Sequence, residues 1–316
     1  MRPLFSVIIP VYNRAPVLRR ALSSVLAQSC QDFEIVVIDD GSSDNPAQVV
    51  ADFSDLRIRF IRQPNRGGGA ARNAGIDVAR GRFIAPLDSD DEFLPGHLER
   101  MKQLLNCSSN MVGYARVLVD RGNGRSLLKP PRALRPGEHV ATYLLCDRGF
   151  VPTITVCLET ALARRVRYAE HLRFAEDTDF AIRLFLEGYR FAMLEEPGAV
   201  WHDLHDPHRA SANRKGARLA EWIEELRPQI PAKAYYGCRG WTLAKGIAQQ
   251  NRLKALQLYA EALLHGCYRP RLAAIVFLQI FLSDSLYRRV ADRAIGALGF
   301  MRKRPVNSEP AFPQAA

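Results

Sequence analysis

The chain has 316 residues, of which 47% are hydrophobic and 24% are charged, and it contains 21 glycines and 19 prolines. This composition excludes an intrinsically disordered chain, a collagen-like repeat and a small disulfide-rich scaffold. The 44 lysines and arginines outnumber the 33 aspartates and glutamates, and the resulting net charge of +11 raises nucleic acid, an anionic membrane or a phosphorylated ligand as partners.

The first 120 residues alternate strand and helix signals. Helix-starting residues and helical periodicity predict helices from Pro16, over residues 69–79 and from Pro95. This alternation indicates an α/β fold with a mostly parallel sheet flanked by helices, in which ligands bind beyond the carboxyl ends of the strands. Short β-branched runs predict the strands at residues 6–11, 34–40, 58–62 and 82–87.

The remaining sequence is read as a connector followed by helices. Residues 120–140 are rich in glycine, proline and arginine, and residues 150–200 return to apolar and helical patterning. Beyond Gly216 the chain is almost wholly helical. Within these stretches, helices are expected over residues 177–187, as a pair within 241–265, and over 270–290. We therefore expect an α/β domain over residues 1–215, a helical extension over 216–301 and a disordered, proline-rich tail over 302–316.

Cysteine usage and apolar runs bear on the compartment. The six cysteines are scattered without a C-x-x-C pair, which predicts reduced thiols and no zinc site. No secretory signal opens the sequence. The longest apolar stretch, residues 272–282, is interrupted by Gln279 and is too short to span a bilayer. These features predict a cytoplasmic protein.

Positive charge is concentrated in the last third of the chain. Residues 200–316 hold 18 basic and 9 acidic side chains, whereas residues 1–199 hold 26 and 24. Arginines flank the apolar run 272–282 on both sides, which suits a helix lying on an anionic membrane surface. A core helix with a solvated basic face explains the pattern equally well. Nucleic acid is not expected, because no zinc-finger, RRM or similar signature accompanies the charge.

Three carboxylates within four residues, Asp88, Asp90 and Asp91, follow the strand at residues 82–87. Like charges at this spacing repel one another unless a cation lies among them. Mg²⁺ and Mn²⁺ prefer oxygen ligands and often bind through one or two carboxylates together with substrate phosphates. A solvated acidic turn before the next helix is the competing explanation.

Three further polar clusters lie at strand or helix ends. Asp39 and Asp40 precede Gly41 and Ser42, where a carboxylate can bind a base N–H or sugar hydroxyls, or simply form an Asx turn. The glycine-rich run over residues 65–73 opens a helix whose free N–H groups favour an anion, yet it is neither a Walker A loop nor a dinucleotide fingerprint. Glu176-Asp177 opens a helix, where carboxylates are commonly caps.

Taken in chain order, these segments resemble the family 2 glycosyltransferases. The resemblance covers roughly residues 3–212 and implies the GT-A fold and transfer of a sugar, with inversion, from a nucleotide-diphosphate donor. The segments that carry it are SVIIPVYN at residues 6–13, IDDGS at 38–42, GAARN at 69–73, LDSDD at 87–91 and AEDTD at 175–179.

The resemblance implies how the donor nucleotide is bound. Pro10, Tyr12 and Asn13 match the loop that packs against the base. Asp40, with Asp39 as the second choice, matches the carboxylate that reads the base. Arg72 matches the basic residue near the nucleotide, with Asn73 in support.

The resemblance also implies a metal site and a catalytic base. Asp90 is expected to contact Mn²⁺ or Mg²⁺ directly, and Asp88 to contact the ribose or the metal. His202 is a candidate third metal ligand or phosphate contact, within a variable segment that often closes over the diphosphate and continues to Arg209 and Ser211. Asp177 matches the catalytic base, and Glu176 and Asp91 are expected to support the acceptor side.

One departure from the family bears on the product. No Gln-x-x-Arg-Trp follows Asp177, which the processive synthases carry, so a hexosyl or related transferase that adds one sugar per encounter is expected. The acceptor would be a glycan, lipid-linked or other hydroxyl in cell-envelope synthesis, in the cytoplasm or on the cytoplasmic face of the inner membrane. A nucleotidyltransferase of related fold, and a basic nucleic-acid-binding or membrane-binding protein, are the alternatives.

Overall fold

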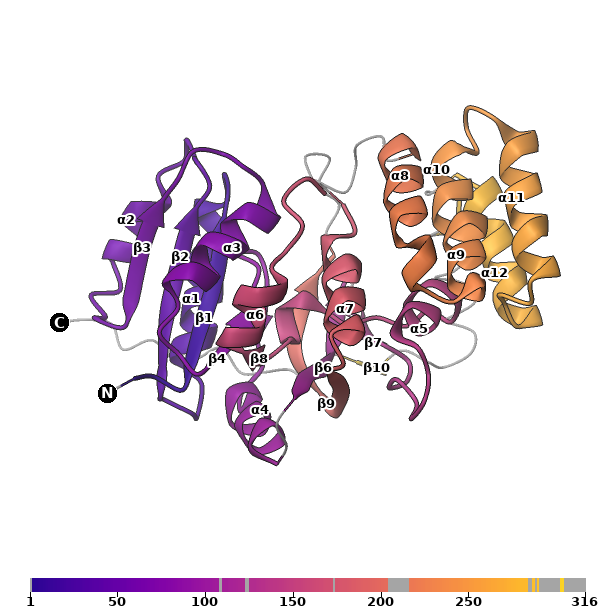
Figure 1. The fold of residues 1–316 in the computed structure, drawn as a ribbon. Helices are drawn as coiled ribbons and strands as arrows, with labels where there is room; N and C mark the ends of the chain where they lie inside the picture. The colour runs from indigo at the N-terminus through magenta and orange to yellow at the C-terminus, as the bar shows by residue number, and fades with distance from the viewer. Residues whose placement is uncertain are drawn as a thin grey trace.

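The computed structural model describes residues 2–107, 110–122, 125–172, 174–203, 216–283, 286–287, 289 and 302–303. Three parts follow one another along the molecule (Figure 1). An N-terminal α/β part is followed by a central part with a second sheet, and a block of helices lies at the end opposite the N-terminus.

The first sheet contains the four strands expected from the sequence, each within a residue of its expected bounds. Its order is β3-β2-β1-β4-β8, with β1 to β4 parallel and the short β8 antiparallel at the edge. The expectation of a mostly parallel sheet is therefore confirmed. The strands are β1 (Phe5–Val11), β2 (Phe33–Asp39), β3 (Ile58–Arg62), β4 (Phe83–Pro86) and β8 (Leu158–Glu159).

Helices cover both faces of this sheet, which explains why its strands are continuous apolar runs rather than alternating ones. Because successive side chains of a strand point to opposite faces, Val7 and Ile9 of β1 pack in one core with α1 and α4, and Ile8 packs in another with α3 and α6. Proline near the start of α1 fixes where that helix begins. The helices are α1 (Ala15–Leu26), α2 (Pro46–Ala51), α3 (Gly68–Val78), α4 (His97–Asn106) and α6 (Thr160–Val166).

The second sheet departs from the sequence-based expectation. Its order is β10-β7-β6-β9-β5, and the long strands β6 and β9 pair in parallel with a register shift near Arg116. The stretch 120–140 is therefore not only a connector, and residues 190–202 are not helical. The strands are β5 (Glu92–Phe93), β6 (Met111–Asp120), β7 (Arg125–Lys129), β9 (Arg190–His202) and β10 (Arg302–Lys303).

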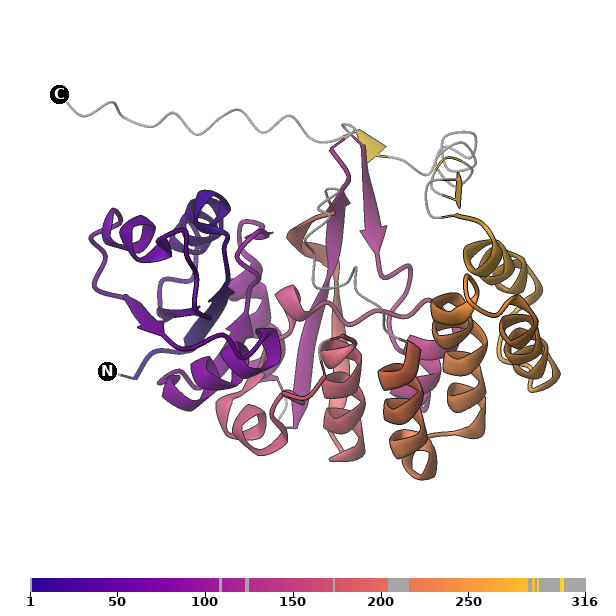
Figure 2. The same cartoon turned by 90° about the horizontal axis from the view of Figure 1, so that it is seen from above.

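The strand β10 occupies the first two residues of the tail that was expected to be disordered. Arg302 and Lys303 pair antiparallel with Ser126 and Arg125 of β7, and the yellow strand beside β7 in Figure 2 marks this contact. Residues 304–316 of the expected tail lie outside the described residues.

The C-terminal region is helical, as expected, with different boundaries. The first helix of the expected 241–265 pair begins earlier, because α9 runs through a π-helical turn over Arg239–Leu243 into α10. The expected helix over 270–290 ends at Phe281. The helices of this part and its surroundings are α5 (Val140–Cys146), α7 (Glu176–Leu186), α8 (Gly216–Leu226), α9 (Ala232–Cys238), α10 (Ala244–Ile247), α11 (Arg252–Leu264) and α12 (Pro270–Phe281).

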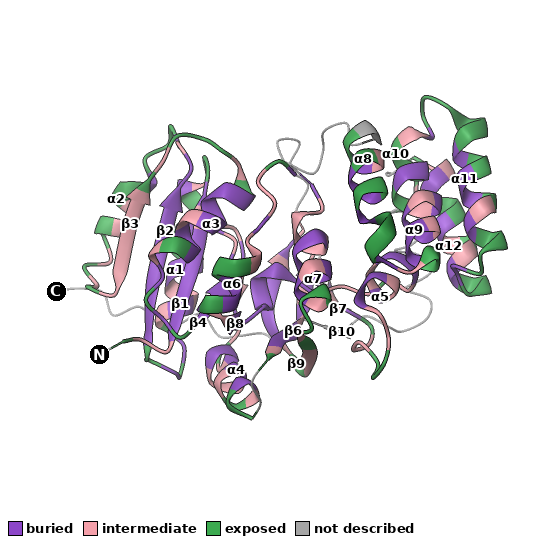
Figure 3. Ribbon diagram, viewed as in Figure 1, coloured by how far each residue is buried: buried purple, intermediate pink, exposed green. Residues whose placement is uncertain are grey.

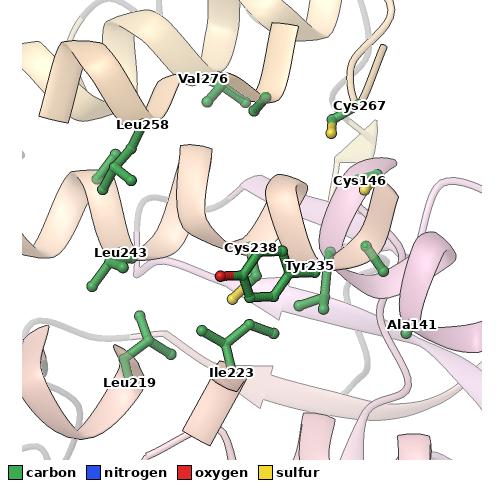
Figure 4. Close-up of a cluster of buried hydrophobic side chains, with 14 of the residues drawn as sticks. Ala141, Cys146, Leu219, Ile223, Tyr235, Cys238, Leu243, Leu258, Cys267 and Val276 are labelled. Atoms are coloured by element: carbon green, nitrogen blue, oxygen red, sulfur yellow. The ribbon is translucent and has the colours of Figure 1, made fainter. Parts of the chain in front are cut away.

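The helical region shares one hydrophobic core with α5 and α7 of the central part. Leu219, Ile223 and Val276 lie in the same buried cluster as Ala141 and Cys146 of α5 (Figure 4). Besides this packing, the Trp222 indole N–H of α8 donates a 2.9 Å hydrogen bond to Asp179 Oδ1 of α7. The helices from residue 216 onwards therefore brace α7 directly.

The apolar run 272–282 forms most of α12. The sequence left open whether this run is a core helix or lies on a membrane surface, and the structure answers part of that question. Leu272, Val276 and Ile280 are buried in the shared core, as in a core helix, whereas Phe277 and Leu278 stay exposed. Among the described residues, no helix combines the length and the apolar character that a membrane crossing requires.

Candidate active site

The polar clusters singled out in the sequence meet at the carboxyl ends of the parallel strands. Asn13 follows β1, Asp40 follows β2 and Asp88 follows β4. In the parallel register the end of β1 at Val11 lies beside Asp39 of β2. Such an edge of a parallel sheet is where ligands bind in open α/β folds.

The loop after β1 combines an exposed aromatic ring with a structural asparagine. Tyr12 is 50% exposed and Pro10 is half-buried. Asn13 has a positive φ of 51°, and it ties this loop to the one after β2. Its backbone N–H donates to Ser42 Oγ at 3.0 Å, and its Oδ1 accepts from the Ser43 N–H at 2.8 Å. Asn13 thus fixes the loop, whereas the Tyr12 ring offers an open flat surface.

The two carboxylates after β2 have different surroundings. Asp40 holds the loop before α3, since its Oδ1 accepts from Gln63 Nε2 at 2.7 Å and from the Arg66 N–H at 2.9 Å, and its Oδ2 accepts from the Gly67 N–H at 2.8 Å. One acceptor position remains at Asp40 Oδ2.

Asp39 is buried and has the less satisfied carboxylate. Its Oδ1 accepts from the Ser42 N–H at 2.8 Å. Its Oδ2 is buried without a hydrogen-bond partner among the described residues, and Arg62 Nε lies 3.5 Å away. Both aspartates can therefore accept another hydrogen bond, and the geometry does not separate them.

Arg72 is a buried cation beside three carboxylates. Its Nη2 donates to Asp88 Oδ1 at 2.7 Å, its Nη1 lies 3.6 Å from Glu176 Oε1, and its guanidinium lies over the Tyr168 ring. Burial alone would lower the pKa of Arg72, but the charges of Asp88 and Asp177 outweigh it and raise that pKa well above its usual value. Within the described chain its Nε and Nη1 have no hydrogen-bond partner.

Asn73, which the resemblance places in support of Arg72, is hydrogen-bonded to the segment around Tyr168. Its Oδ1 accepts from the Tyr168 N–H at 2.8 Å, and its Nδ2 donates to the Tyr168 carbonyl at 2.9 Å and to Glu170 Oε1 at 3.0 Å. These bonds use both of its N–H donors. Asn73 therefore anchors the segment that places the Tyr168 ring under Arg72.

The three carboxylates after β4 point in different directions. Asp88 pairs with Arg72, and Asp90 Oδ2 lies 2.6 Å from Arg14 Nη1. Asp91 is buried, and its Oδ1 accepts from the His202 N–H at 2.8 Å. Burial and the charges of Asp88 and Asp90 raise the pKa of Asp91 well above its usual value, which is the repulsion expected from the sequence.

This donor set fits a divalent cation that completes its coordination with phosphate oxygens. The described residues include no group of three His, Cys, Asp or Glu side chains that could hold a metal by itself. Mg²⁺ commonly binds through one or two carboxylates plus substrate phosphates. Asp88 and Asp90 offer carboxylate oxygens as metal ligands at the strand end, whereas the Asp91 carboxylate accepts a hydrogen bond from β9.

His202 lies at the end of β9 between two carboxylates. Its Nε2 is 2.9 Å from Glu92 Oε1 and its Nδ1 is 3.7 Å from Asp120 Oδ2. Its link to the acidic cluster runs through its backbone N–H to Asp91. Both ring nitrogens thus face carboxylates other than Asp88 and Asp90, which weakens the prediction of a third metal ligand. The rest of the variable segment, with Arg209 and Ser211, lies outside the described residues.

Asp177 is the second residue of α7, in a position suited to a base. Its Oδ1 is buried with no hydrogen-bond partner in the described part of the chain, and the nearby Thr153 hydroxyl acts to lower its pKa. Burial raises its pKa to about 6; Arg72 opposes this, while Glu176 and Asp88 add to it. A carboxylate that titrates near neutral pH can take up a proton and release it again.

Sequence reasoning missed three residues of this site. Thr153 and Tyr168 lie in no motif, and their roles depend on contacts with Asp177 and Arg72. Arg14, the partner of Asp90, directly follows the Val-Tyr-Asn segment. Its adjacency to that motif was the one signal that could have identified it.

A polar cleft of about 440 Å³ lies beside this site. It runs between residues 170–172 and one face of α8, and the bond from Trp222 to Asp179 places that face next to the helix of Asp177. Its lining carries three carboxylates, an imidazole and a guanidinium: Glu170, His171, Leu172, Arg218, Glu221, Trp222 and Glu225.

Comparison with known proteins agrees with this geometry. A family model described as "Glycosyl transferase family 2" matches residues 6–172, which includes the clusters after β1, β2 and β4 but ends before Asp177. The chain is 28% identical to the amylovoran biosynthesis glycosyltransferase AmsB of Erwinia amylovora, over 76% of this chain and 83% of AmsB. It is 32% identical to the succinoglycan biosynthesis protein ExoO of Rhizobium meliloti, over 63% of this chain but only 61% of ExoO.

Solved structures establish the fold class. The structure of S. aureus TarS 1–349 in complex with UDP-GlcNAc superposes with a TM-score of 0.61 at 19% identity, covering 93% of this chain and 92% of that one. The fold is therefore GT-A, as expected, with a helical C-terminal region.

Proposed function

The chain belongs to glycosyl transferase family 2, and on that premise we propose that it transfers one sugar per encounter, with inversion, from a nucleotide-diphosphate donor to an acceptor hydroxyl. The observation that carries the proposal is the cluster of the buried Arg72 with the partly exposed Asp88 and Asp177 at the sheet edge. It places a fixed cation next to a carboxylate whose pKa is raised to about 6.

The nucleotide would bind over the loops after β1 and β2. The exposed Tyr12 ring offers a stacking surface for the base, beside Pro10, and Asp40 or Asp39 would accept a hydrogen bond from a base N–H. The TarS structures with UDP-GlcNAc and with UDP support a nucleotide donor by analogy. Arg72 keeps two unused N–H groups that suit diphosphate oxygens.

Asp88 and Asp90 would hold Mn²⁺ or Mg²⁺. When bound, the cation would offset negative charge on the leaving diphosphate. Arg14 and Arg72 already neutralise these two carboxylates in the structure, so both arginines could turn toward the phosphates once a cation takes their place.

Asp177 would act as the general base. As the acceptor oxygen forms its bond to the anomeric carbon, the bond from that carbon to the diphosphate oxygen breaks with its electron pair, and the hydroxyl proton passes to Asp177. Burial of its Oδ1 without a hydrogen-bond partner, together with the charges of Glu176 and Asp88, favours taking up that proton. Attack from the side opposite the diphosphate inverts the configuration at the anomeric carbon.

The acceptor would lie in the cleft beside α8. Its carboxylates can accept hydrogen bonds from several hydroxyls, which suits a glycan better than an apolar chain. Glu170 is fixed there by Arg66 and Asn73. The names of AmsB and ExoO refer to amylovoran and succinoglycan synthesis, and they support a cell-envelope or exopolysaccharide acceptor, with the enzyme acting in the cytoplasm.

The test is an assay with UDP-, GDP- and dTDP-sugars and Mn²⁺ or Mg²⁺ that identifies the released product. Nucleoside diphosphate is expected. Pyrophosphate would instead identify a nucleotidyltransferase, the alternative that the sequence left open. Hydrolysis of the donor in the absence of an acceptor gives the same product and so tests the donor side independently of the acceptor.

A further inference from the structure

The outward side of α11 is apolar. Leu253 and Leu264 are 82% and 87% exposed, and Leu256 and Leu263 between them are also exposed. Their spacing of three, seven and eleven residues places them on one side of a helix, opposite the buried Ala255, Leu258, Tyr259 and Ala262.

Helix α12 packs against α11 and carries two further exposed apolar side chains, Phe277 and Leu278. The Phe277 ring lies 5.6 Å from the ring of Tyr259 on the inner side of α11. We call Leu253, Leu256, Leu263, Leu264, Phe277 and Leu278 the distal face. It lies on the helices farthest from the N-terminal sheet, and the outer side of α11 is coloured as exposed in Figure 3.

Basic side chains border the distal face. Arg252 and Lys254 are exposed at the start of α11, and Arg269 and Arg271 at the start of α12. Glu261 is the only acidic residue between positions 250 and 283, and it is engaged with Arg239 and Gln257. The surface is therefore apolar at its centre and positive at its edge.

We propose that the distal face docks on the surface of an anionic lipid bilayer. Exposed leucine and phenylalanine side chains next to arginine and lysine are the combination that anchors helices at the headgroup boundary. A symmetric contact with a second copy would bring two positive borders together, which charge repulsion opposes. This surface differs from the single amphipathic helix expected from the sequence, because the apolar residues come mainly from α11. The inference does not rest on the proposed reaction.

The test is sedimentation of the full chain with vesicles of phosphatidylcholine alone and of equal parts phosphatidylcholine and phosphatidylglycerol. Binding to the anionic vesicles only is expected, and it should weaken with added salt. The double variant Leu253→Ser/Leu264→Ser should bind anionic vesicles with an affinity at least about tenfold lower than that of the wild type. The charge-reversed variant Arg269→Glu/Arg271→Glu should also lose binding. Leu56→Ser is the matched control, since Leu56 is equally exposed but lies between α2 and β3.

Three outcomes would overturn the proposal. The wild-type chain could stay in the supernatant with anionic vesicles, or the double serine variant could bind as well as the wild type. Sedimentation velocity could also show a dimer that the double serine variant dissociates, in which case the distal face is an interface between copies. Circular dichroism and thermal unfolding verify that each variant is folded, which is expected because the substituted side chains are solvent-exposed.

Discussion

Replacing Asp177 by asparagine should abolish transfer and stabilise the fold. The pKa of Asp177 is raised from 3.8 to about 6, so the charged carboxylate is disfavoured in the folded state. A shift of two units corresponds to about 3 kcal/mol. As pH rises, the unfolded chain loses this proton near pH 3.8 and the folded chain only near pH 6, so the wild type bears the full destabilisation above pH 6 and none of it below pH 3.8.

Asparagine keeps the shape without the charge, so Asp177→Asn should be more stable than the wild type at neutral pH, by up to about 3 kcal/mol, and equally stable near pH 4. Urea unfolding at both pH values measures this. Glu187→Gln is the control, because it removes the same charge at the exposed other end of α7, where only the surface pair with Arg165 is lost.

Activity gives the second readout. Loss of a general base typically reduces the rate by about 10²–10⁴, and in the wild type kcat/KM should rise with pH through about 6. If the Asp177→Asn variant retains transfer, Asp177 is not the general base. A variant that loses stability at neutral pH would instead show that the carboxylate is not held at a cost in the folded state, and the reasoning from its buried Oδ1 would fail.

Four other substitutions test the donor side and the core. Asp40→Asn and Asp39→Asn should differ in UDP affinity by calorimetry: the base-reading aspartate should lose about tenfold or more, and equal affinities for both variants and the wild type would exclude both. Arg72→Lys should weaken UDP binding by about tenfold, because the arginine guanidinium can bond Asp88 and still offer further N–H groups to the diphosphate, whereas lysine cannot do both. Unchanged binding would show that Arg72 does not contact the diphosphate. His97 is fully buried without a hydrogen-bond partner in the described chain, and burial lowers its pKa from 6.5 to about 3. The contribution of His97 to stability should therefore fall as pH drops below 6.5, by about 2 kcal/mol at pH 5. His97→Leu should lack this part of the pH dependence in urea unfolding, whereas the opposite contribution of Asp177 should remain.

The sequence was informative where structure depends on short-range patterns. The strands of the first sheet are β-branched runs between turn residues, and their ends place Asp40 and Asp88 at one edge without further information. The strand β9 was missed because Glu195, Glu196 and Pro197 interrupt its apolar pattern. Its pairing with β6 is a contact between segments about 80 residues apart, with a register shift that no local pattern reports.

The roles of the site residues likewise divide into those indicated by local motifs and those set by long-range contacts. Asn73 belongs to a motif, yet its amide is used to hold Tyr168, which lies 95 residues further along the chain. Thr153 belongs to no motif and contacts Asp177 through the fold. Motifs thus located the residues of the candidate site, whereas the surroundings that shift the pKa values of Arg72 and Asp177 required the tertiary structure.

The helical extension packs directly against the helix that carries Asp177. Asp177 lies in the first turn of α7, which is held at Asp179 by the Trp222 indole of α8 and packs through Ile182 into the core shared with α8 to α12. The helices that carry the distal face therefore share a core with the helix that carries the candidate base. Docking on a bilayer through α11 would accordingly hold α7 and the cleft beside α8 in one orientation relative to the headgroups.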